Sequence, residues 1–306
     1  MKKIINIFTL SIILLFIFFL ISKNKVVLES TTFSISLWKD TLFPNLFPFF
    51  ILSKILIEYD LINPINKVLS IFFTKLFKLP KDYSYILLIS LISGYPSGAK
   101  YINDLLDKKL ISINNANRLL TFTNYANPIF ILGFIRYLLN KRLAFIIFIS
   151  HILSGLITGI ILNINKPIEN NINIQGNKNY PKIGNLLKES IIDSINTLLL
   201  LLGIITLFLL ISNFLKITFN LNNSLYLLLS SLLEMSNGII NINLTNMGIN
   251  LKAILIAGII SFSGFSIHAQ VLGILSNYKI KYKYFLLSRI LHSIIAIILV
   301  YLLIII

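Results

Sequence analysis

The sequence predicts an all-α polytopic membrane protein. Of its 306 residues, 56% are hydrophobic and only 12% are charged, and the mean hydropathy is +0.86. Soluble domains carry about 25% charged residues, so a water-soluble fold is excluded. The 27 Lys and Arg residues exceed the 11 Asp and Glu residues, for a net charge of +16. In a chain this apolar we assign the excess to loops at the membrane surface and expect no nucleic-acid partner.

The composition also limits the chemistry. The chain has no cysteine, which excludes disulfides, thiolate metal sites and cysteine nucleophiles. His151, His268 and His292 are far apart and lack the spacing of metal ligands. No nucleophile with a base and an orienting group, and no phosphate-binding loop, is apparent. We therefore expect a protein that is not an enzyme and has no catalytic residues, metal or cofactor.

Nine hydrophobic segments are candidates for membrane helices. The first follows Lys2 and Lys3, and no small-residue cleavage site comes after it, so residues 1–33 are expected to hold an uncleaved N-terminal transmembrane helix. The other eight segments are 34–57, 83–106, 119–139, 143–162, 191–215, 225–240, 253–275 and 284–306. A further apolar stretch, 61–79, contains three lysines and is expected to lie in the membrane interface.

A polar stretch divides the chain into two halves. Residues 164–188 are rich in Asn and are expected to form a cytoplasmic linker between a first repeat, 34–163, and a second repeat, 189–306. At an offset of 140, Gly98 falls on Gly238. In a chain so rich in Leu and Ile such matches also arise by chance, so the alignment alone leaves repeat and coincidence open.

Both halves contain hydrophobic segments interrupted by polar residues, Gly or Pro. The first pair of interruptions is 93–100 and 233–238, and the second pair is 124–128 and 263–270. Backbone freed from helical pairing is tolerated at membrane depth only where it is buried in protein or lines a wet cavity. Paired broken segments therefore predict a secondary transporter whose binding site lies at the midplane.

The distribution of charge favours one topology. If the first broken segment of each half is a re-entrant hairpin, seven crossings remain and the N-terminus is cytoplasmic. The cytoplasmic side then holds 17 Lys and Arg residues, Arg289 among them, and the opposite side holds seven: Lys23, Lys25, Arg136, Lys141, Arg142, Lys216 and Lys252. This bias follows the positive-inside rule. Each half then has three crossings, so the two halves are expected to be inverted repeats.

Four motifs resemble a known family, the sporulation integral membrane protein YlbJ (SpoVV) family, whose members contain the nucleoside-recognition Gate domain. The motifs are Leu-Phe-Pro-Phe-Phe at 46–50, Ser-Gly-Tyr-Pro-Ser-Gly-Ala-Lys at 93–100, Leu-Glu-Met-Ser-Asn-Gly at 233–238, and Ser-Ile-His-Ala-Gln at 266–270. The resemblance implies transport of dipicolinic acid across the outer forespore membrane, from the mother cell toward the spore. It also implies two Gate-like repeats and a fold similar to concentrative nucleoside transporters, with two re-entrant hairpins and two broken helices around the substrate.

The candidate substrate-binding residues lie in the interruptions. They are Tyr95, Ser97, Lys100, Asn124, Asn127, Glu234, Ser236, Asn237, Ser266, His268 and Gln270. Lys100 has three alternatives: it snorkels, pairs with a carboxylate, or meets an anionic substrate. Glu234 either couples to a proton or cation, pairs with Lys100, or caps a half-helix. His268 either binds the substrate or bonds a neighbouring carbonyl.

Several functions remain open on the sequence alone. The first is a transporter of dipicolinic acid, a small aromatic dicarboxylate, in the mother-cell-derived outer forespore membrane or in the cell membrane. The alternatives are a nucleoside-type or other small-solute permease, and a sporulation membrane scaffold that transports nothing. The expected partners are a small anionic substrate and the lipid bilayer. A coupling ion, H⁺ or Na⁺, and a homo-oligomer are left open.

Overall fold

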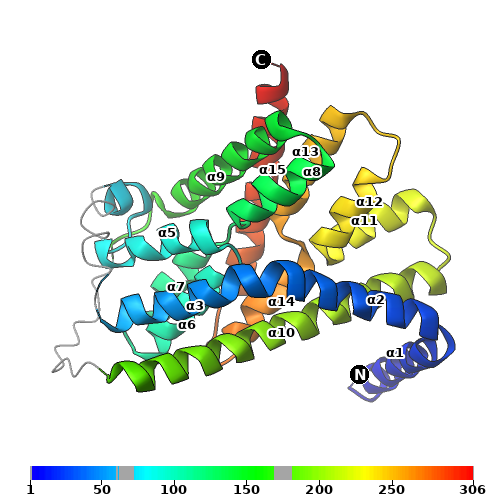
Figure 1. Ribbon diagram of the computed structural model, residues 1–306, viewed down its shortest axis with the longest axis horizontal. Helices are drawn as coiled ribbons and strands as arrows, with labels where there is room; N and C mark the ends of the chain where they lie inside the picture. The colour runs from blue at the N-terminus through cyan, green and yellow to red at the C-terminus, as the bar shows by residue number, and fades with distance from the viewer. Residues whose placement is uncertain (1, 60, 62–71, 169–180, 306) are drawn as a thin grey trace.

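The computed structural model describes residues 2–59, 61, 72–168 and 181–305, and these residues form helices and connecting turns with no strand (Figure 1). The principal helices are α1 (Lys2–Ser22), α2 (Asn24–Leu37), α3 (Phe43–Glu58), α5 (Ser84–Ser93), α6 (Ser97–Asp107), α7 (Ile113–Leu120), α9 (Lys141–Asn163), α10 (Ile183–Thr218), α11 (Asn223–Leu233), α12 (Met235–Asn243), α13 (Ile249–Phe262), α14 (Gly264–Ile274) and α15 (Tyr282–Ile305). Short pieces join them: η1 (Trp38–Leu42), η2 (Lys81–Tyr83), η3 (Phe130–Ile135) and α8 (Arg136–Leu138).

Four stretches in the described part of the chain are long and apolar enough to cross a membrane. They are Lys141–Asn163, Ile183–Thr218, Ile249–Ile274 and Tyr282–Ile305. A fifth is added if Thr9–Ser22 and Asn24–Leu42, which meet at 91°, form one bent span. An apolar helix of about 20 residues matches the hydrocarbon thickness of a bilayer. The expected all-α, multi-pass architecture is confirmed.

Two long helical rods lie side by side, with α2, η1 and α3 forming one and α10 the other (Figure 1). Ser34 Oγ and Thr206 Oγ1 are 2.7 Å apart, and Trp38 Nε1 donates to the carbonyl oxygen of Leu198 at 2.8 Å. Because Ser34 faces the later residue of α10 and Trp38 the earlier one, the rods run antiparallel. The first rod is helical from Asn24, ten residues before the expected segment 34–57 begins.

Two expected segments, the linker 164–188 and the interfacial segment 61–79, lie partly outside the described residues, and the linker also differs from its prediction. The last six residues of the expected linker 164–188 are helical, because α10 begins at Ile183, where the apolar pattern of the span already starts. Residues 169–180 of that linker lie outside the described residues, as do residues 62–71 of the expected interfacial segment 61–79. Residues 72–77 of that segment are helical.

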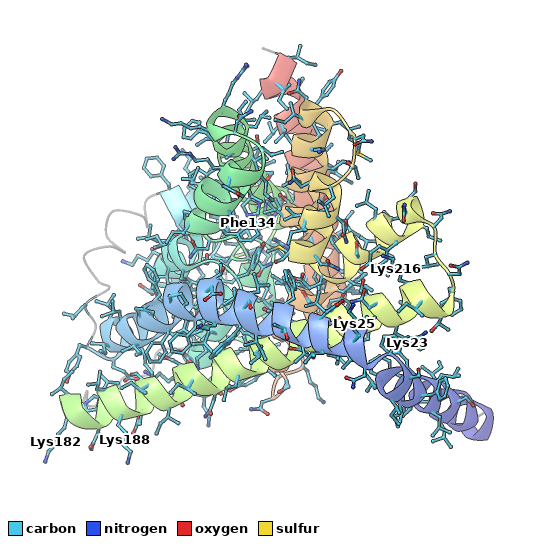
Figure 2. All side chains as sticks on the ribbon, turned by 45° about the vertical axis from the view of Figure 1, so that its right-hand side comes forward. Lys23, Lys25, Phe134, Lys182, Lys188 and Lys216 are labelled. Atoms are coloured by element: carbon cyan, nitrogen blue, oxygen red, sulfur yellow. The ribbon has the colours of Figure 1, made fainter. Side chains whose placement is uncertain are left out.

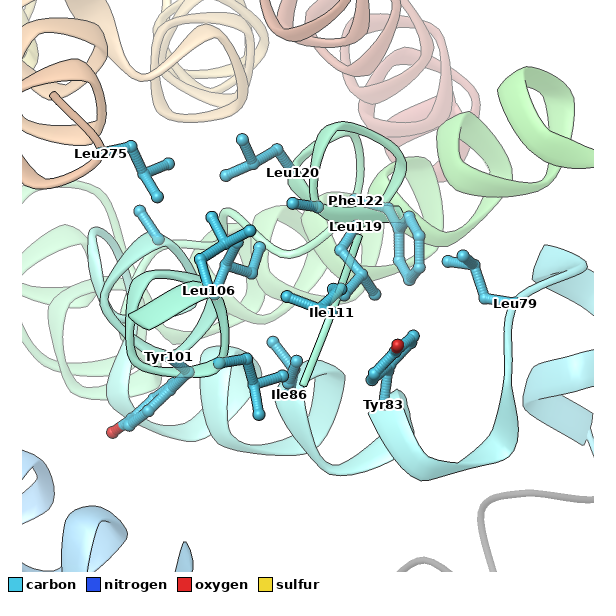
Figure 3. Packing of buried hydrophobic residues seen from close by; sticks show 14 of the residues in the cluster. Leu79, Tyr83, Ile86, Tyr101, Leu106, Ile111, Leu119, Leu120, Phe122 and Leu275 are labelled. Atoms are coloured by element: carbon cyan, nitrogen blue, oxygen red, sulfur yellow. The ribbon is translucent and has the colours of Figure 1, made fainter. Parts of the chain in front are cut away.

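The hydrophobic core is densest where α5, α6 and α7 meet. Figure 3 shows side chains of this cluster, including Ile86, Tyr101, Leu119 and Phe122, which are at most 1% exposed. The Phe77 and Phe122 rings stack with centroids 4.2 Å apart. Interdigitated packing of this kind fixes the position of a helix pair relative to its neighbours. The core therefore holds α5 and α6 as a fixed unit against α7.

The helices break within the predicted interruptions, and one of these breaks is shorter than predicted. α5 and α6 are separated at Gly94–Pro96, and α11 and α12 are separated at Glu234. The helix α7 ends at Leu120, and most of the backbone from there to Pro128 is non-helical. The interruption expected over 263–270 is confined to Ser263, whose φ is +77°, because residues 266–270 satisfy their backbone groups within α14.

Candidate functional site

The interruptions from both halves meet at a small cavity, which we call the central cavity. Tyr95 comes from the α5–α6 break, Asn127 from the non-helical segment after α7, and Met235 and Ser236 from the start of α12. The remaining lining residues are Leu37, Thr41, Leu42, Leu46, Ser93 and Phe130. The cavity volume is about 40 Å³, which holds a few water molecules at most. The site is therefore closed to a small aromatic molecule in this conformation.

A direct contact joins the two halves across the central cavity. The hydroxyl of Tyr95 donates to Met235 Sδ at 2.6 Å, and both residues are buried. The side chains belong to two different helix breaks that are 140 positions apart in the sequence. The closed cavity thus depends on contact between the α5–α6 and α11–α12 tips.

The first hairpin tip is attached to the non-helical segment that follows α7. The backbone N–H of Tyr95 donates to the carbonyl of Tyr125 at 2.5 Å, and Asn127 Nδ2 donates to the carbonyl of Ser93 at 3.0 Å. A Cβ atom on Gly98 would lie 1.9 Å from the carbonyl oxygen of Thr123. Gly98 is therefore required for α6 to approach this backbone so closely.

The second hairpin is built differently. Glu234 caps α12 by accepting a hydrogen bond from the backbone N–H of Asn237 at 2.8 Å, as a carboxylate does at a helix N-terminus. A Cβ atom on Gly238 would lie 2.3 Å from Cα of Ser231, so this glycine allows α12 to fold back on α11. Gly98 and Gly238 are both needed for close approach, although they approach different partners.

Arg289 was assigned to the cytoplasmic loops by the charge count, but it is completely buried in α15. Its guanidinium donates to the carbonyl oxygens of Asn124 and Thr121, both at 2.7 Å, and lies 3.0 Å from His292 Nδ1. These carbonyls belong to backbone freed by the end of α7. A cation near a helix C-terminus, donating to freed carbonyls, stabilises the interruption. The sequence signal was a single Arg inside an otherwise apolar span.

Two stacked histidines extend this network. The rings of His151 and His292 have centroids 4.7 Å apart. His151 Nε2 accepts from the backbone N–H of Ala126 at 2.9 Å, and its Nδ1 lies 2.8 Å from Ser261 Oγ. His292 Nε2 donates to the carbonyl of His151 at 2.8 Å. The histidines thus link α9 and α15, and they also contact α13 and the non-helical segment after α7.

The two broken helices touch each other directly. Asn124 Nδ2 donates to Ser263 Oγ at 3.2 Å, so the interruption after α7 contacts the one between α13 and α14. Among the predicted site residues, Asn124 therefore joins the two breaks without lining the central cavity. Ser263 was included only as part of the interrupted range, and its left-handed backbone marks the break itself.

The other predicted site residues do not line the central cavity. Lys100 donates to Asp104 at 2.9 Å, one helical turn along α6, and not to Glu234. His268 Nε2 donates to the carbonyl of Phe262 at 3.0 Å, and its Nδ1 lies 3.0 Å from the Tyr282 hydroxyl. Three more predicted residues are buried, and they are Ser97, Ser266 and Gln270.

Charged side chains cluster away from the central cavity, at the end of α10 that carries Asp193. Asp193 pairs with Lys54 of α3, and Glu58 pairs with Lys108. The hydroxyl of Tyr278 donates to Asp107 at 2.5 Å, and this hydrogen bond raises the pKa of Tyr278 to about 12 because it stabilises the protonated phenol. These contacts tie α3, α6 and α10 together beside a pocket of about 180 Å³.

The fold and this site define a multi-pass membrane protein in which helix breaks converge on a small, mostly apolar cavity with a few polar groups in its wall. The chain is similar to the sporulation integral membrane protein YlbJ of Bacillus subtilis (strain 168), with 29% identity over 92% of this chain and 79% of that protein. No protein-family model and no solved structure matches the chain. The relative is a sporulation integral membrane protein, in agreement with the membrane fold.

Proposed function

We propose that this protein is a membrane transporter that moves dipicolinic acid across the outer forespore membrane during sporulation. The observation that carries the proposal is the meeting of the α5–α6, α7–η3 and α11–α12 breaks at one cavity. Helix breaks at membrane depth cost backbone hydrogen bonds and are characteristic of substrate sites in secondary transporters. The similarity to a sporulation membrane protein supports the biological setting.

The proposal includes inverted repeats with an architecture similar to concentrative nucleoside transporters. In each half, a long rod is followed by a helix pair broken at its tip, a second broken segment and a closing span, namely α9 or α15. His151 and His292, which correspond at an offset of 141, stack on each other. In this scheme α5–α6 and α11–α12 are the re-entrant hairpins.

The N-terminus of α6 supplies positive potential for a carboxylate, whereas the N-terminus of α12 is already capped by Glu234. Ser236 lies in the first turn of α12 and lines the central cavity, and α6 begins at Ser97, two residues after Tyr95. Exposed N–H groups and the helix dipole favour an anion at such positions. Lys100 is paired to Asp104, so the positive potential for a carboxylate comes from the α6 N-terminus unless this ion pair opens when substrate enters. The tips must also part, because the closed cavity is too small for the substrate.

One observation favours a second candidate, a permease for nucleosides or other neutral solutes. The side chains that line the central cavity are all uncharged. A scaffold without transport activity is a third possibility, but it gives no reason for the polar groups of Tyr95, Asn127 and Ser236 to converge on one cavity.

Uptake by proteoliposomes tests these alternatives. Purified protein is reconstituted, and accumulation of labelled dipicolinate is measured without a gradient and with an H⁺ or Na⁺ gradient. We expect saturable uptake that excess unlabelled dipicolinate abolishes and excess nucleoside does not. Nucleoside uptake without dipicolinate uptake would support the permease instead. Protein-free liposomes are the blank, and an Asn127→Leu variant, which removes a cavity amide at similar volume, should lower the uptake.

A further inference from the structure

A second, larger pocket lies at the opposite end of α10 from the ion pairs, between α2, α10 and the α11–α12 hairpin. We call it the Lys216 pocket, and its volume is about 390 Å³. This is within the usual size range of small-molecule sites, whereas the central cavity is about 40 Å³. Its wall contains Asn237, and the preceding residue, Ser236, lines the central cavity. Only the first turn of α12 therefore separates the two spaces.

Polar groups from four helices, α2, α10, α11 and α12, converge in the Lys216 pocket. Asn213 Nδ2 donates to Ser30 Oγ at 2.8 Å, and the Tyr226 hydroxyl donates to Asn213 Oδ1 at 3.1 Å. Asn237 Nδ2 is 3.5 Å from the Tyr226 hydroxyl, a long contact that leaves most of its donor capacity for a ligand. The amides are thus held in place by a network that connects α2, α10 and the second hairpin.

Lys216 gives the pocket its charge. Its Nζ lies 4.1 Å from the centroid of the Tyr226 ring, and no carboxylate among the described residues is within 4.0 Å of it. Glu29 lines the same pocket but is exposed, and Lys23 and Lys25 lie at the same end of the molecule (Figure 2). Three cations against one carboxylate make this end positive. An ammonium without a counter-ion, beside amide donors, favours an anionic ligand.

We propose that the Lys216 pocket is a binding site for a small carboxylate, distinct from the central cavity and on the path that leads to it from this side of the membrane. Lys216 pairs with one carboxylate, the Asn237 amide donates a hydrogen bond, and Tyr226 presents an aromatic wall. The inference rests on the proposed function for the identity of the carboxylate, which is the transported dicarboxylate. The location of the proposed site rests on the Lys216 pocket alone.

The absence of native cysteine allows a direct test. Val26 lines the same pocket from α2. A Val26→Cys variant in lipid nanodiscs is treated with a maleimide, and the modification rate is measured with pyridine-2,6-dicarboxylate or with pyridine. Bound ligand slows modification by a factor of one plus [L]/Kd, or about tenfold at ten times Kd. We expect protection by the dicarboxylate and none by pyridine.

Variants then test the role of Lys216. Added to Val26→Cys, Lys216→Met should abolish protection, and Lys216→Arg should retain part of it. Lys252→Met is the matched control, because Lys252 is similarly half-buried but donates to the Asn243 carbonyl outside the pocket. If Lys216→Met does not give a monodisperse protein, Lys216→Gln replaces it. The comparison of pyridine-2,6-dicarboxylate with pyridine in the Val26→Cys variant still decides whether the carboxylates of the ligand are required.

The outcomes separate this inference from the proposed function. Protection that needs Lys216, in a protein that takes up no dipicolinate, would keep the site and refute transport. Uptake without protection of the thiol in the Val26→Cys variant would refute the site and keep transport. Protection that persists when Lys216→Met is added would also overturn the site as proposed.

Discussion

Arg289 Nη1 donates a hydrogen bond to the carbonyl oxygen of Asn124 at 2.7 Å, 165 positions away in the sequence. The bond joins the last span to backbone that the end of α7 leaves without helical partners. In a membrane, where water does not reach the protein interior, such carbonyls need an internal donor. The charge of Arg289 therefore has a structural role, since it stabilises the interruption on which Asn127 reaches the central cavity.

Replacing Arg289 should destabilise the protein. In Arg289→Met the carbonyls of Asn124 and Thr121 lose their donors, at about 1–3 kcal/mol for each buried group left unsatisfied. We expect a lower thermal unfolding midpoint in detergent and no uptake. Arg142→Met, at an exposed position near the start of α9, is the control and should match the parent. An unchanged midpoint in Arg289→Met would show that the network contributes little.

Gly98→Ala should disrupt the approach of α6 to the non-helical segment. The added Cβ would lie 1.9 Å from the Thr123 carbonyl oxygen, so one of the two backbones must move. We expect loss of uptake together with a lower unfolding midpoint. Gly203→Ala in α10 adds the same methyl group with nothing within 4 Å, and it should be neutral or stabilising by about 0.5–1 kcal/mol. Equal behaviour of the two variants would contradict the close contact.

The role of Lys100 can be separated from that of its partner. Lys100→Met leaves Asp104 without its cation, so a loss of uptake in this variant alone has two explanations. If Lys100 leaves Asp104 and contacts the substrate, we expect the double variant Lys100→Met with Asp104→Asn to show the same loss of uptake as Lys100→Met. In that case uptake should fall about tenfold or more, because a charge-assisted contact contributes roughly 1.5–3 kcal/mol. Recovery in the double variant would limit Lys100 to a structural ion pair.

The proposed topology places the two ends of α10 on opposite sides of the membrane. Figure 2 shows Lys182 and Lys188 at one end and Lys216 at the other. We expect Lys182→Cys to react with an impermeant reagent only from the cytoplasmic side, and Lys141→Cys and Lys216→Cys only from the opposite side. Labelling of Lys182→Cys from outside intact cells would refute the topology.

Hydropathy and composition predicted the fold class, and the Gly, Pro and polar interruptions predicted where helices break. These signals are local, since a helix loses hydrogen bonds wherever its backbone departs from helical geometry. Tyr95, Asn127 and Ser236 were recognised as site residues because they lie in such interruptions, and the structure brings them to one cavity. Whether they bind substrate remains a prediction.

Partners that are distant in sequence could not be predicted in this way. Lys100 is adjacent to an interruption, but its carboxylate partner is one turn along its own helix. Arg289 was counted with the cytoplasmic charges although it lies within the expected segment 284–306, and only the fold shows that it faces the end of α7. The Lys216 pocket requires four helices to meet, and nothing in the spacing of Ser30, Asn213 and Asn237 indicates that they do.

The length of α10 has a consequence for the surrounding lipid. Between Lys188 and Lys216 the helix rises about 42 Å at 1.5 Å per residue, whereas the hydrocarbon core is about 30 Å thick. For both lysines to reach the headgroups, α10 must lie about 45° from the bilayer normal. Any rocking of this rod alters its hydrophobic mismatch with the bilayer. Acyl-chain length should therefore shift the balance between its orientations, so that membrane thickness itself acts on the protein.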